Sequence, residues 1–146
     1  MAHYTDFKLY WEDWGGYPDR SCPFGEPTLM WVIATKDRTA RCIVDRAHRG
    51  AMDVTWNAKW KGIPYSLVEP LPNLLEEAGV FTELKPLVED AADGDYLAVW
   101  DLTGIVRARA FHISLKFTCP GERWTPLGQK VKAALYALRS YEGATA

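Results

Sequence analysis

The chain has 146 residues, which is the usual length of one domain with a single hydrophobic core. Its residues are 48% hydrophobic and 25% charged, and this composition excludes a disordered chain or a fibre. The formal net charge is −2, although the charges are unevenly distributed along the chain. We therefore expect one globular domain over residues 1–146.

The sequence shows no recognisable membrane or export signal. No stretch approaches the roughly 18 consecutive apolar residues of a membrane span. The first six residues lack the basic and apolar regions of a signal peptide. The cysteines, Cys22, Cys42 and Cys119, are too few for a disulfide framework and lack paired metal-ligand spacing. These features predict a cytoplasmic protein that needs no membrane, metal ion or cofactor.

The first half of the chain is typical of antiparallel strands joined by turns. Strands are predicted at Tyr4–Trp11, which is rich in aromatic residues, and at Leu29–Thr35, a continuous apolar run typical of a buried strand. The segment 15–27 between them is rich in glycine and proline and is predicted to be a loop. Strands are also expected at Ala40–Arg46 and Met52–Asn57, so that three hairpin-linked strands form a meander.

The centre of the chain is predicted to be helical before it returns to a strand. A first short helix is expected to begin near Pro72 and to end at Gly79. A second short helix is expected to begin near Pro86 and to end before residue 93. The apolar run Tyr96–Asp101 then predicts another buried strand.

The last part of the chain predicts a turn, a long strand and a helix. Thr103-Gly104 indicates a turn into a strand over Ile105–Phe117. The final helix has Thr125 as N-cap, Pro126 in its first turn and Gly143 past its end. Its apolar face comprises Leu127, Val131, Leu135 and Leu138. The elements together predict an α+β domain with a mainly antiparallel sheet of about six strands, two short central helices and one C-terminal helix.

Charge is segregated along the chain. Residues 36–61 carry a net charge of +4, residues 62–106 carry −8, and residues 107–139 carry +6. If the two basic segments meet in the fold, they create a field that attracts anions such as phosphates. The alternative is that basic strands face acidic helices, as in many ordinary domains. Arg107 and Arg109 open the second basic segment and are candidates for binding phosphate.

His112 and Ser114 are the residues of the long strand that indicate chemistry. Side chains at positions i and i+2 of a strand share a face, so this imidazole and hydroxyl are expected to point into the same space. An imidazole titrates near neutral pH and can serve as general acid or base. The apolar face is predicted to hold Phe111, Ile113, Leu115 and Phe117, and the opposite face Val106, Ala108, Ala110, His112, Ser114 and Lys116.

The segment His112-Ile113-Ser114-Leu115-Lys116-Phe117 resembles the signature of the two-histidine phosphoesterases, and His3-Tyr4-Thr5 resembles a shorter copy of it. Members of that family are bilobal α+β domains that cleave phosphodiesters without a metal ion. The resemblance implies that His112 and His3 form the acid–base pair, while Ser114 and Thr5 hold phosphate oxygens. The implied substrate is a nucleotide, a cyclic nucleotide or an RNA end, with Lys116 as a further phosphate ligand.

Aromatic residues support a second, non-enzymatic hypothesis. Trp56 and Trp60 alternate with lysines and are candidates for stacking on bases or sugars. Trp11 is predicted to belong to an anchor for a protein partner, whereas Trp31 and Trp100 lie in apolar runs and are expected in the core. The alternative function is therefore a regulatory or inhibitor-like module that binds a protein or an anionic ligand through basic strands and exposed aromatic residues.

Overall fold

A computed structural model describes residues 7–17, 28–34, 39–46, 60–89, 96–119 and 123–141. Its elements follow the chain in the order β1 (Phe7–Tyr17), β2 (Thr28–Ala34), β3 (Ala40–Arg46), β4 (Lys61–Ile63), α1 (Tyr65–Val68), α2 (Pro70–Ala78), β5 (Val88–Glu89), β6 (Tyr96–Val106), β7 (Arg109–Cys119), β8 (Arg123–Trp124) and α3 (Pro126–Arg139).

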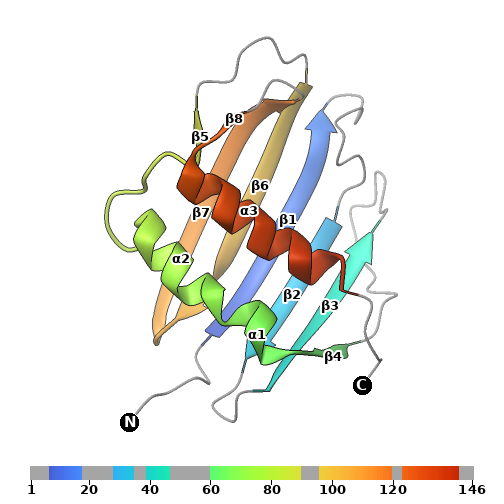
Figure 1. Ribbon diagram of the computed structural model, residues 1–146. Coiled ribbons are helices and arrows are strands. Elements are labelled where there is room, and N and C mark those ends of the chain that lie inside the picture. The colour runs from blue at the N-terminus through green and yellow to red at the C-terminus, as the bar shows by residue number, and fades with distance from the viewer. Residues whose placement is uncertain are drawn as a thin grey trace.

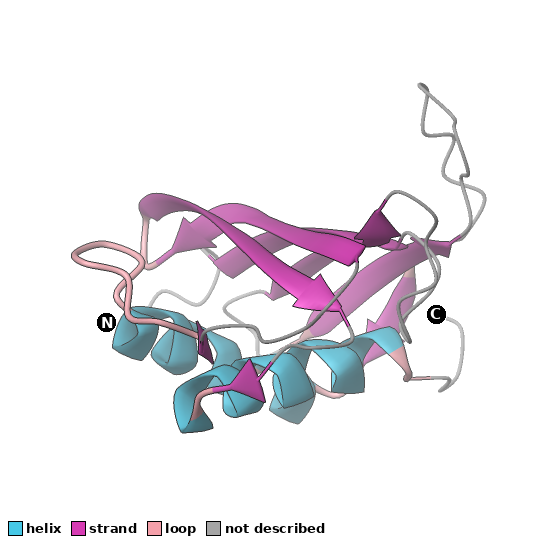
Figure 2. Ribbon diagram, turned by 90° about the horizontal axis from the view of Figure 1, so that it is seen from above, coloured by secondary structure: helices cyan, strands magenta, loops and turns pink. Residues whose placement is uncertain are grey.

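The elements form two layers (Figure 1). Six strands make one antiparallel sheet in the order β4-β3-β2-β1-β6-β7, and β5 pairs with β8 in a separate two-stranded ribbon. All three helices lie on one side of the large sheet, as the view from above shows in Figure 2. The predicted α+β class with a six-stranded, mainly antiparallel sheet is confirmed. Within the described ranges, no helix is long and apolar enough to cross a membrane.

The core lies between the helices and the sheet face that they cover. Leu9 and Trp11 of β1 and Trp100 and Leu102 of β6 are fully buried there. The rings of Trp11 and Trp100 meet edge to face, with centroids 5.0 Å apart and an interplanar angle of 74°. Such pairs add about 0.5–1.5 kcal/mol beyond the burial of their area. The middle strands therefore anchor the helical layer.

α3 begins where the sequence predicts. The hydroxyl of Thr125 accepts a hydrogen bond from the backbone N–H of Gly128 at 3.0 Å, which satisfies one of the free N–H groups of the first turn. Pro126 occupies the first turn, where its missing N–H costs nothing. Of the predicted apolar face, Leu127 is half-buried, and three residues are fully buried: Val131, Leu135 and Leu138. The helix ends at Arg139, before the predicted Gly143, which lies outside the described residues.

The predicted turn at Thr103-Gly104 is wrong. β6 continues to Val106, and the chain reverses through a two-residue loop of Arg107 and Ala108, whose φ angles are 50° and 62°. Positive φ at both loop positions is typical of the hairpin turns whose twist matches antiparallel strands. Val106 is consequently the last residue of β6 and is buried, so it does not belong to the exposed face of the following strand.

Gly104 lies within β6, where it allows close packing and does not form a turn. A Cβ at this position would lie 2.9 Å from the carbonyl carbon of Lys8 in β1 and 3.0 Å from the ring of Phe111 in β7. Glycine is required here because the neighbouring backbone and ring approach closely. In a strand, glycine therefore indicates close packing as well as a turn.

The central helices also differ from the prediction. The described chain from Pro86 to Glu89 is not helical; Leu87 is buried and β5 follows it. The two short helices instead adjoin one another as α1 and α2. Gly79 ends α2 with φ 88°, as its position predicts.

The N-terminal strands extend beyond their predicted limits on one side. β1 runs to Tyr17, through part of the glycine-rich segment predicted as a loop, with a register shift between Asp13 and Gly16. A bulge of this kind accommodates the extra residue within the ladder. β2 and β3 lie where they are predicted, but β4 pairs with β3 at this edge, while the predicted strand Met52–Asn57 lies outside the described residues.

Candidate functional site

The sheet face opposite the helices, here called the open face, carries most of the polar and aromatic candidates. Side chains alternate between the two faces of a strand, so those flanking the buried positions point to this side. Its described members are Lys8, Tyr10 and Glu12 of β1; Trp31 and Ile33 of β2; Arg41 and Ile43 of β3; Val99, Asp101, Thr103 and Ile105 of β6; and Ala110, His112, Ser114 and Lys116 of β7.

Strand register gathers the aromatic members into one row. Trp31 lies opposite Tyr10, Tyr10 opposite Thr103, and Thr103 opposite His112. The rings of Tyr10 and Trp31 are tilted by 37° with centroids 4.6 Å apart, and both side chains are partly exposed. The centre of the open face is therefore an aromatic pair between strands β1 and β2.

The roles expected of two tryptophans are thus reversed. Trp31, predicted to be core, lies on the open face, while Trp11, predicted to anchor a partner, is fully buried under the helices. The apolar run of β2 misled the prediction because it is apolar on both faces: Met30 and Val32 fill the core, while Trp31 and Ile33 are partly exposed. Because apolar residues occupy both alternating sets of positions in this run, the sequence already indicated that the strand carries apolar side chains on both faces of the sheet.

A row of acidic and hydroxyl groups lies beside the aromatic row. Glu12 of β1 is opposite Asp101 of β6, and Asp101 is opposite Ser114 of β7. The Nε2 atom of His112 lies 3.4 Å from the Oδ1 atom of Asp101, and both side chains are exposed to solvent. Two carboxylates directly opposite one another repel each other, so this row favours cations nearby.

Tyr10 is coupled to the acidic row. Desolvation, the negative charge of Glu12 and a side-chain hydrogen bond to Glu12, in that order, raise the pKa of the Tyr10 hydroxyl well above its usual value. Residues 10 and 12 share a face of β1, which explains how the phenol reaches the carboxylate. The hydroxyl is therefore held as a neutral hydrogen-bond donor at physiological pH.

Cations border the open face on two sides. Lys8 and Arg41 share a row with Ile33 between them, and Lys116 lies beyond Ser114 along β7. All three charged side chains are exposed. The guanidinium of Arg41 also lies 5.0 Å from the centroid of the partly exposed Trp60 ring, a cation–π contact.

The predicted catalytic residues are described only in part. His112, Ser114 and Lys116 are exposed on one face of β7, as predicted, and the residues between them are buried on the other. His3, Thr5 and Trp56 lie outside the described residues. The two-histidine pair therefore stays a prediction.

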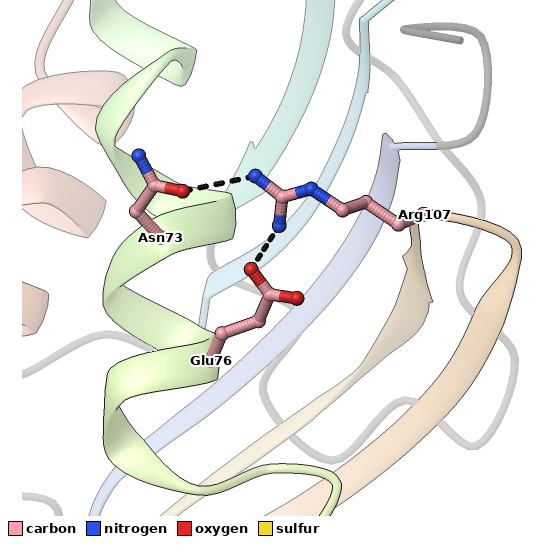
Figure 3. Close-up of polar contacts among 3 residues, drawn as sticks. All are labelled: Asn73, Glu76 and Arg107. Atoms are coloured by element: carbon pink, nitrogen blue, oxygen red, sulfur yellow. Dashed lines mark hydrogen bonds and ion pairs between the residues drawn. The ribbon is translucent and has the colours of Figure 1, made fainter. Parts of the chain in front are cut away.

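The two arginines predicted to bind substrate point elsewhere. Arg107 donates to Asn73 at 2.9 Å and to the carboxylate of Glu76, both in α2 (Figure 3). The guanidinium of Arg109 lies 4.1 Å from the centroid of the Phe81 ring. For Arg107 this is the second of the two arrangements that the charge pattern allows, in which a basic residue pairs with an acidic helix. The structure does not bring these arginines together with His112.

The described side chains offer neither a metal-binding cluster nor a reactive thiol. Among them, no group of three histidine, cysteine, aspartate or glutamate side chains is placed to hold a metal ion. Cys42 is buried on the core face of β3, and desolvation raises the pKa of its thiol despite the opposing effect of Lys61. This thiol is therefore protonated and poorly reactive.

Comparison of the chain with protein-family models, with curated proteins and with solved structures found no match.

Proposed function

We propose that this domain is a non-enzymatic binding module that recognises a protein through its open face. The observation that carries the proposal is the partly exposed Tyr10–Trp31 pair at the centre of a sheet face that bears no described helix. Tryptophan and tyrosine are the residues that most often dominate the energy of protein interfaces. Leaving them in water costs hydrophobic free energy that a partner recovers.

The charges around the aromatic pair favour a protein over a polyanion. Carboxylates of Glu12 and Asp101 lie on one side of the pair, and cations of Lys8 and Arg41 on the other. A phosphate chain along the aromatic row would meet both carboxylates. A protein surface with charges of both signs can match this arrangement and gain orientation from it.

A capture experiment with the tagged chain tests the proposal, using an extract of the cells that encode it. We compare the native protein with Trp31→Ala and with Lys130→Ala, an exposed substitution on α3 at the opposite side of the molecule. We expect the native and Lys130→Ala chains to capture equal amounts of one protein and Trp31→Ala to capture at least tenfold less of it. The reason is that a tryptophan at the centre of an interface often contributes a large part of the binding energy. Equal retention by all three chains would refute the proposal, provided that melting curves show all three folded.

A second candidate function is phosphodiester hydrolysis at His112. The observation that favours it is the Asp101 carboxylate 3.4 Å from Nε2, beside the opposing hydroxyl of Ser114. A carboxylate in this position orients an imidazole and leaves its other nitrogen to exchange a proton with substrate. The family resemblance adds His3 as the second acid or base.

Hydrolysis of 2′,3′-cyclic nucleotides in the presence of a chelator tests this candidate. Metal-free histidine chemistry predicts turnover that survives the chelator, disappears in His112→Ala and is unchanged in Lys130→Ala. His3→Ala then tests the second histidine. Absence of turnover by the native chain, or turnover that persists in His112→Ala, rejects hydrolysis and leaves the binding proposal untouched.

A further inference from the structure

β7 is a long strand at the border of the sheet. It is last in the strand order, and it pairs with β6 through eleven consecutive residue pairs without a register shift. Figure 1 shows it as the outermost strand on the side of α2. Within the described part of the chain, no strand pairs with its outer edge. This edge therefore presents a straight row of backbone donors and acceptors.

The hairpin geometry identifies which backbone groups face outward. In a hairpin with a two-residue loop, the residues that flank the loop, Val106 and Arg109, form a hydrogen-bonded pair, and the pairs then alternate. The outward N–H and C=O groups consequently belong to the even-numbered residues. These include His112, Ser114 and Lys116, whose side chains also lie on the open face.

Natural sheets protect their edges by short strands, prolines, bulges or charges. The opposite edge of the sheet is protected by a short strand, because β4 has only three residues. β7 has eleven residues, no proline and no bulge, and of these devices it carries only the positive charges of Arg109 and Lys116. Such an edge resists most strands but accepts one of opposite charge.

The charges of β7 favour an acidic partner strand over a second copy of this chain. The strand carries Arg109, His112 and Lys116 but no carboxylate. Antiparallel pairing of two β7 strands therefore forms no cross-strand ion pair in any register. An acidic strand instead places a carboxylate opposite Lys116 and another opposite the His112 ring, and a cross-strand pair of opposite charge stabilises a sheet.

The other face of an added strand meets apolar groups. Phe111, Ile113 and Leu115 retain 5–9% exposure at this border, whereas Trp100 and Leu102 of the neighbouring strand retain none. Apolar side chains on the added strand cover the surface of these three residues that is still exposed. Acidic residues alternating with apolar ones therefore fit the edge on both faces.

We propose that β7 accepts an extended acidic segment of a partner protein as a seventh strand, with its carboxylates on the open face. The inference rests on the proposed protein-binding function, since the added strand extends the open face on which Tyr10 and Trp31 lie, with β6 and β7 between them. It adds the chemistry of the partner: alternating acidic and apolar residues in an extended conformation.

The probe is a nine-residue peptide of alternating valine and glutamate with blocked termini, compared with a valine–lysine peptide of the same length. Amide hydrogen exchange and peptide titration by NMR are recorded on the full chain. We expect the acidic peptide alone to slow exchange at the amides of His112, Ser114 and Lys116 by at least tenfold.

Two variants and one control make the test specific. Ser114→Pro removes an outward N–H without removing a bond to β6, and Ser114→Ala keeps that N–H. We expect the proline variant to bind the acidic peptide at least tenfold more weakly and the alanine variant to bind within twofold of the native chain. If Ser114→Pro fails to fold, Lys116→Glu serves instead, with the same tenfold loss expected.

The inference is overturned by unchanged exchange at these amides, by equal binding of both peptides, or by native affinity in Ser114→Pro and Lys116→Glu. A native dimer that Ser114→Pro dissociates also overturns it, because the edge then belongs to a second copy. Each of these leaves the proposed function standing if Trp31→Ala still abolishes capture. Failure of that capture experiment removes the protein-binding proposal itself.

Discussion

Gly128→Ala tests how tightly α3 is seated on the chain that precedes β5. In an open helix this change stabilises by about 1 kcal/mol, because alanine favours the helix more than glycine does. Here the new Cβ would lie 2.8 Å from the carbonyl carbon of Leu87 and 3.1 Å from its Cα, and closer still to the carbonyl oxygen. Because these are backbone atoms of a buried residue, the clash cannot be relieved by rotating a side chain.

The displacement has a further cost. The Leu87 carbonyl accepts from the backbone N–H of Thr125 at 3.0 Å and from its hydroxyl at 3.3 Å, so moving Leu87 disturbs the cap of α3. Overpacking typically costs 1–3 kcal/mol and a weakened hydrogen bond about 1 kcal/mol more. After the gain in helix propensity, we expect a net loss of about 2 kcal/mol.

Thermal unfolding followed by circular dichroism measures this loss. For a chain of this length, about 2 kcal/mol lowers the Tm by about 4–8 °C. Lys130→Ala, two residues further along on the exposed side of α3, controls for the general effect of alanine and is expected within about 0.5 kcal/mol of native. A Gly128→Ala protein that melts at or above the native Tm would refute the close approach of α3 to Leu87.

Three further substitutions probe other parts of the account. Ala108→Gly removes a side chain at φ 62° and is expected to stabilise by about 1 kcal/mol, seen as a higher midpoint in urea; a lower midpoint would contradict the loop geometry. Thr125→Ala removes the N-cap and is expected to cost about 1–2 kcal/mol by the same assay, whereas an unchanged midpoint would mean that the cap contributes nothing. The raised pKa of Tyr10 means that the unfolded chain loses this proton first, so its contribution to stability is complete below about pH 10 and is lost as the pH rises further. Tyr10→Phe should therefore flatten the fall of Tm between pH 9.5 and 11, and identical slopes for both proteins would contradict the shift.

The sequence predicted correctly those helix and strand ends that are fixed by residues at or next to the end. β3 has the predicted bounds Ala40–Arg46, and α3 begins at the predicted cap because Thr125 and Pro126 act within one turn. The turn between β6 and β7 was predicted at the wrong residues because Arg107 and Ala108 are not typical turn residues, while Gly104 is. Its close approach to another strand is a tertiary property that no local pattern contains.

The candidate site was predictable along each strand but not across strands. Alternation in β7 correctly grouped His112, Ser114 and Lys116 on one face. Which strand lies beside which, and in what register, depends on contacts between distant segments. The pairing of Tyr10 with Trp31 therefore appears only in the fold. The sequence also does not say which face of an apolar strand the helices cover. For this reason Trp31 was expected in the core and Trp11 at a binding surface, whereas the fold places them the other way round.

The most direct test of the central claim, that the open face binds a protein, is site-specific photo-crosslinking in the cells that encode the chain. A photoreactive amino acid replaces Ile33, which lies on the open face beside Trp31, or Lys130 on the exposed side of α3. We expect a protein adduct from position 33 and none from position 130. An adduct from position 130 alone, or from neither position, would contradict it.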